Sequence, residues 1–567
     1  MNHDSLPLLE NRLLIYEFFS RMNSVELSDR EKVEKIARDV IEFLKSHPNI
    51  ARNKITNLKG KFAKKYKYGK VIKNATILKY ATESEKKQLN KFLKRRSTRT
   101  LSGVSVIAIM TKPISCPGVC VYCPGADSQP DEKVAKSYTG KEPAAMRSIH
   151  NEYDPYKQVR SRIEDLEAIG HRVDKIELIV MGGTFPSTDV TYQEQFIKGA
   201  LEAIVNKRVD TLEEAKTLAE RSRRRLIGLT IETRPDYCKE VHVDKMLDYG
   251  TTRVEIGVQT LYNNIYELIK RGHTVEDTIE AMRICKDAGL KINAHMMPNL
   301  PGVSLEKDLE TFKDLFANPD FRPDMLKIYP TLVIKGTELY NWWKQEKYTP
   351  YKLDNLVNLI ADVKQNIPPY VRIQRIMRDI PAYLIEAGCN KSNLRQLVQQ
   401  RLKERSKKCN CIRCREYGII KRKNKLENTA LEEVKLQRYD YEASKGKEIF
   451  LSFENKVQNI LIGYLRLRKP SEYAHRPELN DGKTLVVREI RVVGELVPTD
   501  TDPYKSTQIQ HRGYGTLLLQ EAERISHEEF GAAKLAVISG IGARDYFYER
   551  GYQIDGPYVS KMLKNKE

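Results

Sequence analysis

The sequence lacks long apolar runs. Among its 567 residues, no hydrophobic stretch approaches the roughly 20 residues needed to span a bilayer, which argues against a membrane protein. The opening segment, MNHDSLPLLE, has no basic region followed by an apolar one, so we expect no secretory signal. Long low-complexity tracts are absent and 40% of the residues are hydrophobic, which predicts that most of the chain folds. Since single cores rarely grow beyond about 250–300 residues, we expect several domains.

Acidic residues are too few to balance the basic ones. The chain has 97 Lys and Arg against 76 Asp and Glu, a formal net charge of +21. This excess predicts a polyanionic partner, most often nucleic acid; a general adaptation of surface charge is the alternative. Residues 51–96 contain sixteen Lys or Arg against two acidic residues, with Tyr66 and Tyr68 interleaved. Lysines neutralise phosphates and aromatic rings stack on bases, so this segment is a candidate nucleic-acid interface or, alternatively, a solvated basic arm.

The hydrophobic pattern defines four regions. Residues 1–96 are helical and basic, with apolar positions at helical spacing over Glu31–Leu44. Residues 97–390 alternate apolar runs with amphipathic segments, residues 391–430 form a basic connector, and residues 431–567 return to strand signals. The strands expected in the second region are Val104–Met110, Lys175–Met181, Leu226–Glu232, Arg253–Val258, Lys291–Met297, Met325–Tyr329 and Val371–Ile376. Repeated strand–helix alternation predicts an α/β fold with a partial TIM-like barrel, whose active site lies at the carboxyl ends of the strands.

Nine cysteines are distributed unevenly. Two tight groups are Cys116, Cys120 and Cys123, and Cys409, Cys411 and Cys414, whereas Cys238, Cys285 and Cys389 stand apart. In a chain without a secretory signal, tight groups indicate metal binding rather than disulfides, and we expect a reducing, cytoplasmic location. Cys238 and Cys285 have no metal-ligand neighbours in sequence, so we interpret them as buried or incidental.

The first cysteine group follows the first predicted strand with the spacing Cys-x3-Cys-x2-Cys. Three thiolates on one loop can hold three irons of a 4Fe–4S cluster and leave the fourth iron open for S-adenosylmethionine. A structural zinc loop is the alternative, but such a site normally needs four ligands. The loop closely resembles that of the radical S-adenosylmethionine superfamily.

That resemblance implies further cofactor contacts in the second region. Tyr122, just before the last cysteine, suits packing near the adenine. The glycine pair that ends the second strand lets a ligand approach the backbone closely, and the superfamily often has Gly-Gly-Glu there. Glu232 and Gln259 end strands and are expected to point toward the cofactor. Besides Tyr122, the candidate S-adenosylmethionine contacts are therefore Gly182, Gly183, Thr184, Glu232 and Gln259.

The last region is expected to be a separate mixed α/β domain, with strands Ile460–Leu467, Thr484–Val493 and Lys534–Ser539. A glycine-rich turn precedes an amphipathic helix, Thr516–Ser526, and such a turn can surround a pyrophosphate with backbone N–H groups. It resembles the acetyl-CoA motif of GNAT acetyltransferases, and an ordinary helix cap is the alternative; a P-loop is excluded because no Gly-Lys-Ser/Thr follows. The candidate acetyl-CoA residues are Gln510, His511, Arg512, Gly513, Tyr514, Gly515, Thr516, Tyr546, Phe547 and Tyr552.

A radical domain followed by a GNAT domain resembles the catalytic subunit of Elongator in its single-chain archaeal or bacterial form. Supporting segments include Glu232-Thr-Arg-Pro-Asp236 and Glu255-Ile-Gly-Val-Gln-Thr260. The resemblance implies a tRNA uridine carboxymethyltransferase that acts on wobble uridine 34 in the anticodon stem-loop. It implies that a radical abstracts hydrogen from the acetyl methyl of acetyl-CoA, that the carbon radical adds to carbon 5, and that thioester hydrolysis leaves 5-carboxymethyluridine. The three cysteines of the first group and Tyr546 are the expected catalytic residues, although Phe547 stands where the family often has a second tyrosine.

The second cysteine group, Cys409, Cys411 and Cys414, lies in the basic connector. Three close thiolates suit structural zinc with a fourth ligand from elsewhere, and family members outside eukaryotes are similar in carrying zinc here. Cys389 is our first choice for the fourth ligand, with His295, His475 or another histidine left open, and a second iron–sulfur cluster is the alternative.

Two other functions compete with tRNA modification. One is a protein lysine acetyltransferase whose radical half is structural, and the other is a tRNA-binding scaffold without turnover. The absence of a clear catalytic base beside Gln510–Gly515 and the intact three-cysteine loop argue against the acetyltransferase. The intact loop also argues against a scaffold without turnover. We expect tRNA and an electron donor for the cluster as partners. The sequence leaves open whether the chain forms a homodimer.

Overall fold

The computed structural model describes residues 27–51, 54–93, 103–125, 134–424, 433–493 and 513–563. The chain divides into two compact units, a small one of residues 1–100 and 161–173 and a large one of residues 101–160 and 174–567. Among the residues described, no helix is both long enough and apolar enough to cross a membrane.

The small unit is built on four helices around an apolar core. They are α2 (Asp29–Ser46), α3 (Lys54–Lys65), α4 (Asn74–Lys79) and α5 (Glu83–Leu93). Ser28 starts α2, because its side chain caps the amide of Glu31 while the Glu31 carboxylate returns to the Ser28 backbone. The helix expected over Glu31–Leu44 is confirmed. Tyr66 and Tyr68 pack against the core, and the Tyr66 hydroxyl donates to Asp39 at 2.8 Å, so both rings have a structural role.

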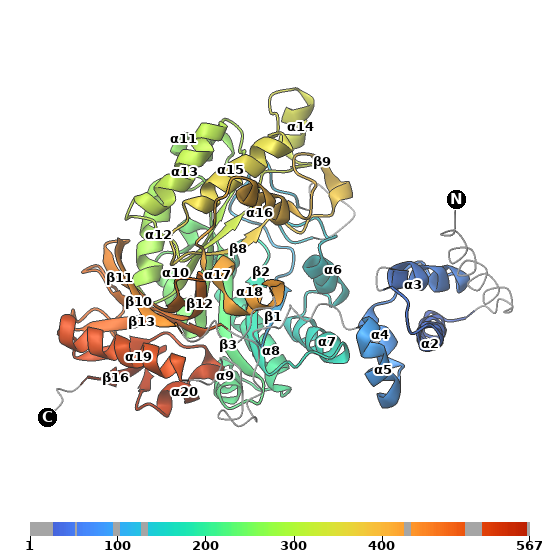
Figure 1. The fold of residues 1–567 in the computed structure, drawn as a ribbon, viewed down its shortest axis with the longest axis horizontal. Coiled ribbons are helices and arrows are strands. Elements are labelled where there is room, and N and C mark those ends of the chain that lie inside the picture. Colours follow the sequence, from blue (N-terminus) through green and yellow to red (C-terminus); the bar gives the residue numbers. More distant parts are fainter. Residues whose placement is uncertain are drawn as a thin grey trace. The chain divides into compact units, whose positions relative to one another are not determined.

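The large unit contains a seven-stranded parallel sheet in the order β1-β2-β3-β4-β5-β6-β8. Its strands are β1 (Val104–Met110), β2 (Lys175–Met181), β3 (Arg225–Thr233), β4 (Thr251–Gln259), β5 (Lys291–Met296), β6 (Met325–Ile328) and β8 (Arg372–Ile376). All seven strands expected from the sequence are found, with ends that differ by two residues or fewer. The strands are joined in chain order through helices that cover the sheet, which makes an open half-barrel (Figure 1). The partial TIM-like barrel is therefore confirmed.

The C-terminal part of the large unit has its own seven-stranded sheet, in the order β10-β11-β12-β13-β14-β16-β15. The strands are β10 (Lys435–Ala443), β11 (Gly446–Asn455), β12 (Ile460–Lys469), β13 (Thr484–Val492), β14 (Lys534–Val537), β15 (Gln553–Asp555) and β16 (Tyr558–Met562). All neighbours are antiparallel except β13 and β14, which pair in parallel only as far as Val487 and Val537. Beyond that point β13 continues without β14, so the two strands leave a gap in the sheet.

The C-terminal sheet lies against the amino ends of the half-barrel strands. Gly540 and Gly542 pack on the backbone at the start of β3, where a Cβ on either glycine would come within 2.6 Å of Ile227 or Leu226. The fully buried Arg488 pairs with Asp324, just before β6, at 2.5 Å. Although burial opposes it, the neighbouring arginines hold the pKa of Asp324 far below its usual range. The two sheets therefore meet through close backbone packing and buried ion pairs.

Candidate active site

The first cysteine loop lies beyond the carboxyl end of β1. Cys116, Cys120 and Cys123 line a cavity of about 180 Å³ above the half-barrel sheet. Cys116 Sγ lies 3.4 Å from the Thr184 hydroxyl, and Arg271 donates to Cys120 Sγ at 3.4 Å. The three sulfur atoms do not all lie within 4.8 Å of one another. Tetrahedral zinc would bring its thiolates to about 3.8 Å, so this spacing suits thiolates on separate irons of a cluster.

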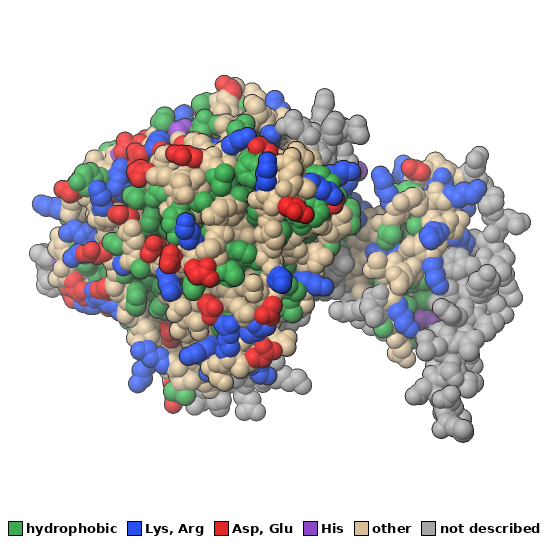
Figure 2. Space-filling view, turned by 90° about the horizontal axis from the view of Figure 1, so that it is seen from above, with side chains coloured by type: hydrophobic (Ala, Val, Ile, Leu, Met, Phe, Trp, Pro, Cys, Tyr) green, Lys and Arg blue, Asp and Glu red, His purple; other side chains and the backbone are tan. Residues whose placement is uncertain are grey.

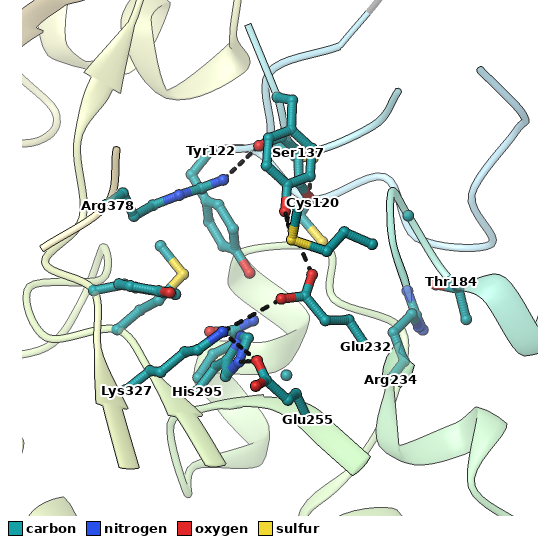
Figure 3. A pocket seen from close by; sticks show the side chains of 18 of the residues that line it. Cys120, Tyr122, Ser137, Thr184, Glu232, Arg234, Glu255, His295, Lys327 and Arg378 are labelled. Carbon is teal, nitrogen blue, oxygen red and sulfur yellow. Dashed lines mark hydrogen bonds and ion pairs between the residues drawn. The ribbon is translucent and has the colours of Figure 1, made fainter. Parts of the chain in front are cut away.

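The opposite wall of the cavity carries buried charges from neighbouring strands (Figure 3). Lys327 on β6 pairs with Glu255 on β4, and its ammonium lies 3.4 Å from Glu232 on β3. His295 Nε2 lies 2.8 Å from the same Glu255 carboxylate. Burial and Lys327 lower the pKa of His295, whereas Lys327 and His295 hold the pKa of Glu255 well below its usual range despite burial. The wall therefore presents an ionised carboxylate, an ammonium and a neutral imidazole side by side.

The residues predicted to contact S-adenosylmethionine lie around this cavity. Tyr122, Gly183, Thr184, Glu232 and Gln259 line it. Gly182 lies beside it with φ 106°, and a Cβ there would come within 2.8 Å of Thr111 Oγ1, so the turn needs glycine.

The sequence analysis assigned no site role to several charged residues that line the cavity, among them Arg271, Glu255, Lys327 and Arg378. Arg378 donates to the Ser137 carbonyl, and Ser137 lies 3.4 Å from Cys123 Sγ. The usable signal was charge at alternating positions of otherwise apolar strands, as at Glu255 and Lys327. In a parallel sheet covered by helices, such charges must point inward or pair.

A second cavity, of about 450 Å³, lies at the amino ends of the half-barrel strands and in the gap between β13 and β14. Tyr546 and Phe547, from α20 (Asp545–Tyr548), line it. The Tyr546 hydroxyl is buried with no hydrogen-bond partner in the described structure, and a Cβ on Gly515 would lie 3.1 Å from it. Gly515 belongs to the first turn of α19 (Tyr514–Arg524), whose N-cap Gly513 has φ 81°. An orphaned hydroxyl beside a helix N-terminus suits a polar ligand such as a thioester.

The remaining predicted acetyl-CoA residues divide into three groups. Gln510, His511 and Arg512 lie outside the described residues. Tyr514 packs its ring on Phe453, and the Thr516 hydroxyl accepts from Arg550 at 3.3 Å. Tyr552 is a core residue whose hydroxyl donates to Glu523, and the hydroxyl of the nearby Tyr548 donates to Glu220 at 2.9 Å.

The second cysteine group forms a compact site. The sulfur atoms of Cys409, Cys411 and Cys414 all lie within 4.8 Å of one another, which fits a single tetrahedral ion. Within the part of the chain that the structure describes, no fourth Cys, His, Asp or Glu joins this group, so Cys389 is not among its members. Instead the buried Lys364, from α15 (Leu353–Gln365), donates to Cys409 at 3.3 Å and Cys414 at 3.7 Å.

The two histidines considered as fourth ligands are engaged elsewhere. His295 lines the first cavity beside Glu255, and His475 Nε2 lies 2.9 Å from Asp244. Cys238 and Cys285 are fully buried, and their thiols contact each other. The interpretation of this pair as buried is confirmed.

The half-barrel with a three-cysteine loop at the carboxyl ends of its strands defines a radical S-adenosylmethionine protein. The Radical SAM superfamily model matches residues 114–315, the Radical_SAM C-terminal domain model matches residues 323–404, and the ELP3 N-terminal domain model matches residues 31–101. The chain is 47% identical to "tRNA uridine(34) acetyltransferase" of Methanocaldococcus infernus, over 94% of this chain and 100% of that protein. It is 44% identical to "Elongator complex protein 3" of Saccharomyces cerevisiae, over 94% and 97%.

A solved structure supports the same assignment. The archaeal Methanocaldococcus infernus Elp3 with an N-terminal deletion has a TM-score of 0.72 and 46% identity, covering 81% of this chain and 99% of that one. The chain belongs to the Elongator complex protein 3 family.

Proposed function

We propose that the protein modifies the wobble uridine of tRNA at carbon 5 by radical chemistry, with acetyl-CoA as the carbon donor, and that the product is 5-carboxymethyluridine. The observation that carries the proposal is the pair of cavities at opposite ends of one half-barrel, one beside three cluster-forming cysteines and one beside Tyr546. The names of the relatives, "tRNA uridine(34) acetyltransferase" and "Elongator complex protein 3", support the substrate. An ordinary acyl transfer cannot attach the methyl carbon of acetyl to a base, because that requires breaking an inert C–H bond.

The residues of the first cavity suit this reaction. When bound, the cluster and S-adenosylmethionine would supply a radical able to abstract hydrogen from the acetyl methyl. Cys116, Cys120 and Cys123 would hold the cluster. After addition to carbon 5, the base must lose one electron and the carbon-5 proton to restore its double bond; the cluster, when bound, would take back the electron, and neutral His295 can accept the proton. Lys327 can bind an acceptor oxygen of the base or of the new carboxylate. Arg271, hydrogen-bonded to Cys120, offsets the negative charge of the thiolates.

The proposal extends to a second metal site and to the partners of the protein. Zinc held by Cys409, Cys411 and Cys414 is structural, since Arg415 from the same loop pairs with Glu454 on β11 at 2.6 Å and Ile412 bonds to Val371 just before β8. The tRNA contacts the small unit, where Lys and Arg predominate among the charged side chains visible in Figure 2. A cytoplasmic electron donor reduces the cluster.

The test is anaerobic. Reconstituted protein is incubated with dithionite, S-adenosylmethionine, acetyl-CoA and tRNA containing uridine 34, and the digested nucleosides are analysed by mass spectrometry. We expect 5-carboxymethyluridine from the wild type and none from Cys120→Ala. Release of 5′-deoxyadenosine without a modified uridine would refute this tRNA as the substrate. Acetylation of lysines that survives Cys120→Ala would favour a protein acetyltransferase instead.

A further inference from the structure

The interior of the half-barrel is charged. Parallel barrels normally fill their interior with branched apolar side chains. Here the inward positions between the two cavities carry Glu177 on β2, Arg253 and Glu255 on β4, Asn293 on β5 and Lys327 on β6. We call these five residues the polar column. Arg253, Glu255, Asn293 and Lys327 are all buried, and buried ions are costly compared with apolar packing, so the column is poorly explained as a device for stability.

The polar column has members in the lining of both cavities. We call the cavity beside the three cysteines the upper cavity and the one beside Tyr546 the lower cavity. Arg253 and Glu177 line the lower cavity, and one guanidinium nitrogen of Arg253 pairs with Glu177. Another lies 3.4 Å from Glu255, which lines the upper cavity and pairs there with Lys327. Glu255 is two residues beyond Arg253 on β4, or about 7 Å. An arginine–glutamate pair therefore links a lining residue of one cavity to a lining residue of the other.

Several buried polar atoms in this region have no hydrogen-bond partner among the described residues. They include Arg253 Nε, Asn293 Oδ1 and the hydroxyl of Tyr546 in the lower cavity. Buried polar atoms are nearly always paired in proteins, and each unpaired one calls for an explanation. A donor and an acceptor in the column, with a hydroxyl at its entrance, match a polar chain such as the amide-bearing pantetheine arm ending in a thioester.

We propose that the acetyl-pantetheine arm of acetyl-CoA reaches the radical cavity through the polar column, entering from the lower cavity when Arg253 moves away from Glu255. This inference rests on the proposed function. In the occupied state Arg253 donates to the arm instead of to Glu255, while Lys327 keeps the Glu255 charge paired. The route brings the acetyl methyl to the radical site without exposing the thioester to solvent. Entry from solvent directly into the upper cavity is the competing route.

The test places a thiol inside the column and asks from which side it is reached. Asn293→Cys is prepared as the protein with its iron–sulfur cluster bound, so that the first three cysteines are protected. The probe is the methyl disulfide of CoA, whose end is similar in size to an acetyl group. Exchange with the thiol releases methanethiol or CoA and leaves a mixed disulfide that intact-mass analysis detects. Wild-type protein gives the background, and Ser539→Cys, in the lower cavity, is the positive control.

A second variant, Gly228→Leu, is designed to block entry from the lower cavity, and we call it the plug. Gly228 lines the lower cavity, and its added Cβ would lie 3.2 Å from Thr252 Oγ1 and 3.9 Å from Glu177 Cγ, so the larger side chain fills the entrance. We expect Asn293→Cys to be labelled well above background, excess acetyl-CoA to block labelling, and the plug to slow it by about tenfold or more. The plug should leave Ser539→Cys reactive, which also shows that the plugged protein is folded.

The outcomes separate the route from the proposed function. Labelling of Asn293→Cys that the plug does not slow would overturn the route, because the probe would then enter from above. Labelling of Ser539→Cys without Asn293→Cys would also overturn it. If neither cysteine reacts, the lower cavity does not bind CoA and the proposed acetyl-CoA site itself fails. As a second readout, deuterium from acetyl-CoA carrying CD3 should appear in 5′-deoxyadenosine with the wild type, and Gly228→Leu should lower that transfer while S-adenosylmethionine cleavage continues.

Discussion

The two cysteine loops have the same number of thiols and nearly the same length, yet the fold gives them different chemistry. Cys116, Cys120 and Cys123 stand apart above the carboxyl ends of the half-barrel strands, in a cavity lined by charged residues. The other loop draws Cys409, Cys411 and Cys414 within 4.8 Å, mostly buried between the half-barrel and the C-terminal sheet. The first arrangement borders a cavity that can take a substrate, whereas in the second Cys409 and Cys411 are buried.

The two loops also differ in the cation beside them. Arg271 donates to Cys120 in the lining of an open cavity, whereas Lys364 contacts two of the three thiols of the second loop and is fully buried. Although burial acts in the opposite direction, the neighbouring thiols raise the pKa of Lys364, so its charge is kept. Position relative to the sheet, more than cysteine spacing, decides which loop is reactive.

The largest expected effect that separates the two loops is that of Cys120→Ala. Loss of one cluster ligand should lower 5′-deoxyadenosine formation by about 1,000-fold or more, because the 4Fe–4S cluster that supplies the electron is no longer held. Zinc content should remain at one per chain and the melting temperature should change little. Elemental analysis, product quantification and calorimetry check these points. A joint loss of iron and zinc would show that the loops are not independent.

Cys411→Ala should have the opposite profile. Loss of structural zinc from a buried junction should cost several kcal/mol, which corresponds to a fall in melting temperature on the order of 10 °C. The folded fraction should still bind iron and cleave S-adenosylmethionine, measured below the lowered melting temperature. Cys285→Ala, which removes a buried thiol outside both loops, is the matched control and should keep its zinc. Full stability of Cys411→Ala would contradict a structural role.

The smallest expected effect concerns the cation of the second loop. Lys364→Met keeps the length of the buried chain but removes its charge and its hydrogen bonds to two thiols. Outer partners of metal ligands are typically worth about 10–100-fold in metal affinity, so zinc should be lost to a chelator at about tenfold lower concentration. The exposed Lys407→Met in the same connector is the control. Equal zinc retention in both variants would show that Lys364 only fills space.

Much of the fold was predictable from local pattern. The seven strands of the half-barrel follow from apolar runs between amphipathic segments, because a strand covered on both faces is mostly apolar and carries charge only at single positions that pair inside. Tyr552, predicted to contact acetyl-CoA, lies in the core, and its contact with the cofactor stays a prediction. Nothing in the local pattern pointed to Lys364 beside the second loop, because it is 45 residues from Cys409 and is not a usual zinc ligand.

Local sequence is enough to specify the two cysteine groups, the strand segments of the half-barrel and the glycine turn before α19. Each is encoded within a short segment, where residue spacing alone fixes which groups can meet. Only the folded chain brings Glu255, His295 and Lys327 to one cavity and pairs Arg253 with both Glu177 and Glu255. Those contacts join strands far apart in the chain, and they depend on the register of the parallel sheet and on which face each residue takes. Neither can be read from one strand, because a shift of one residue would turn every side chain to the opposite face.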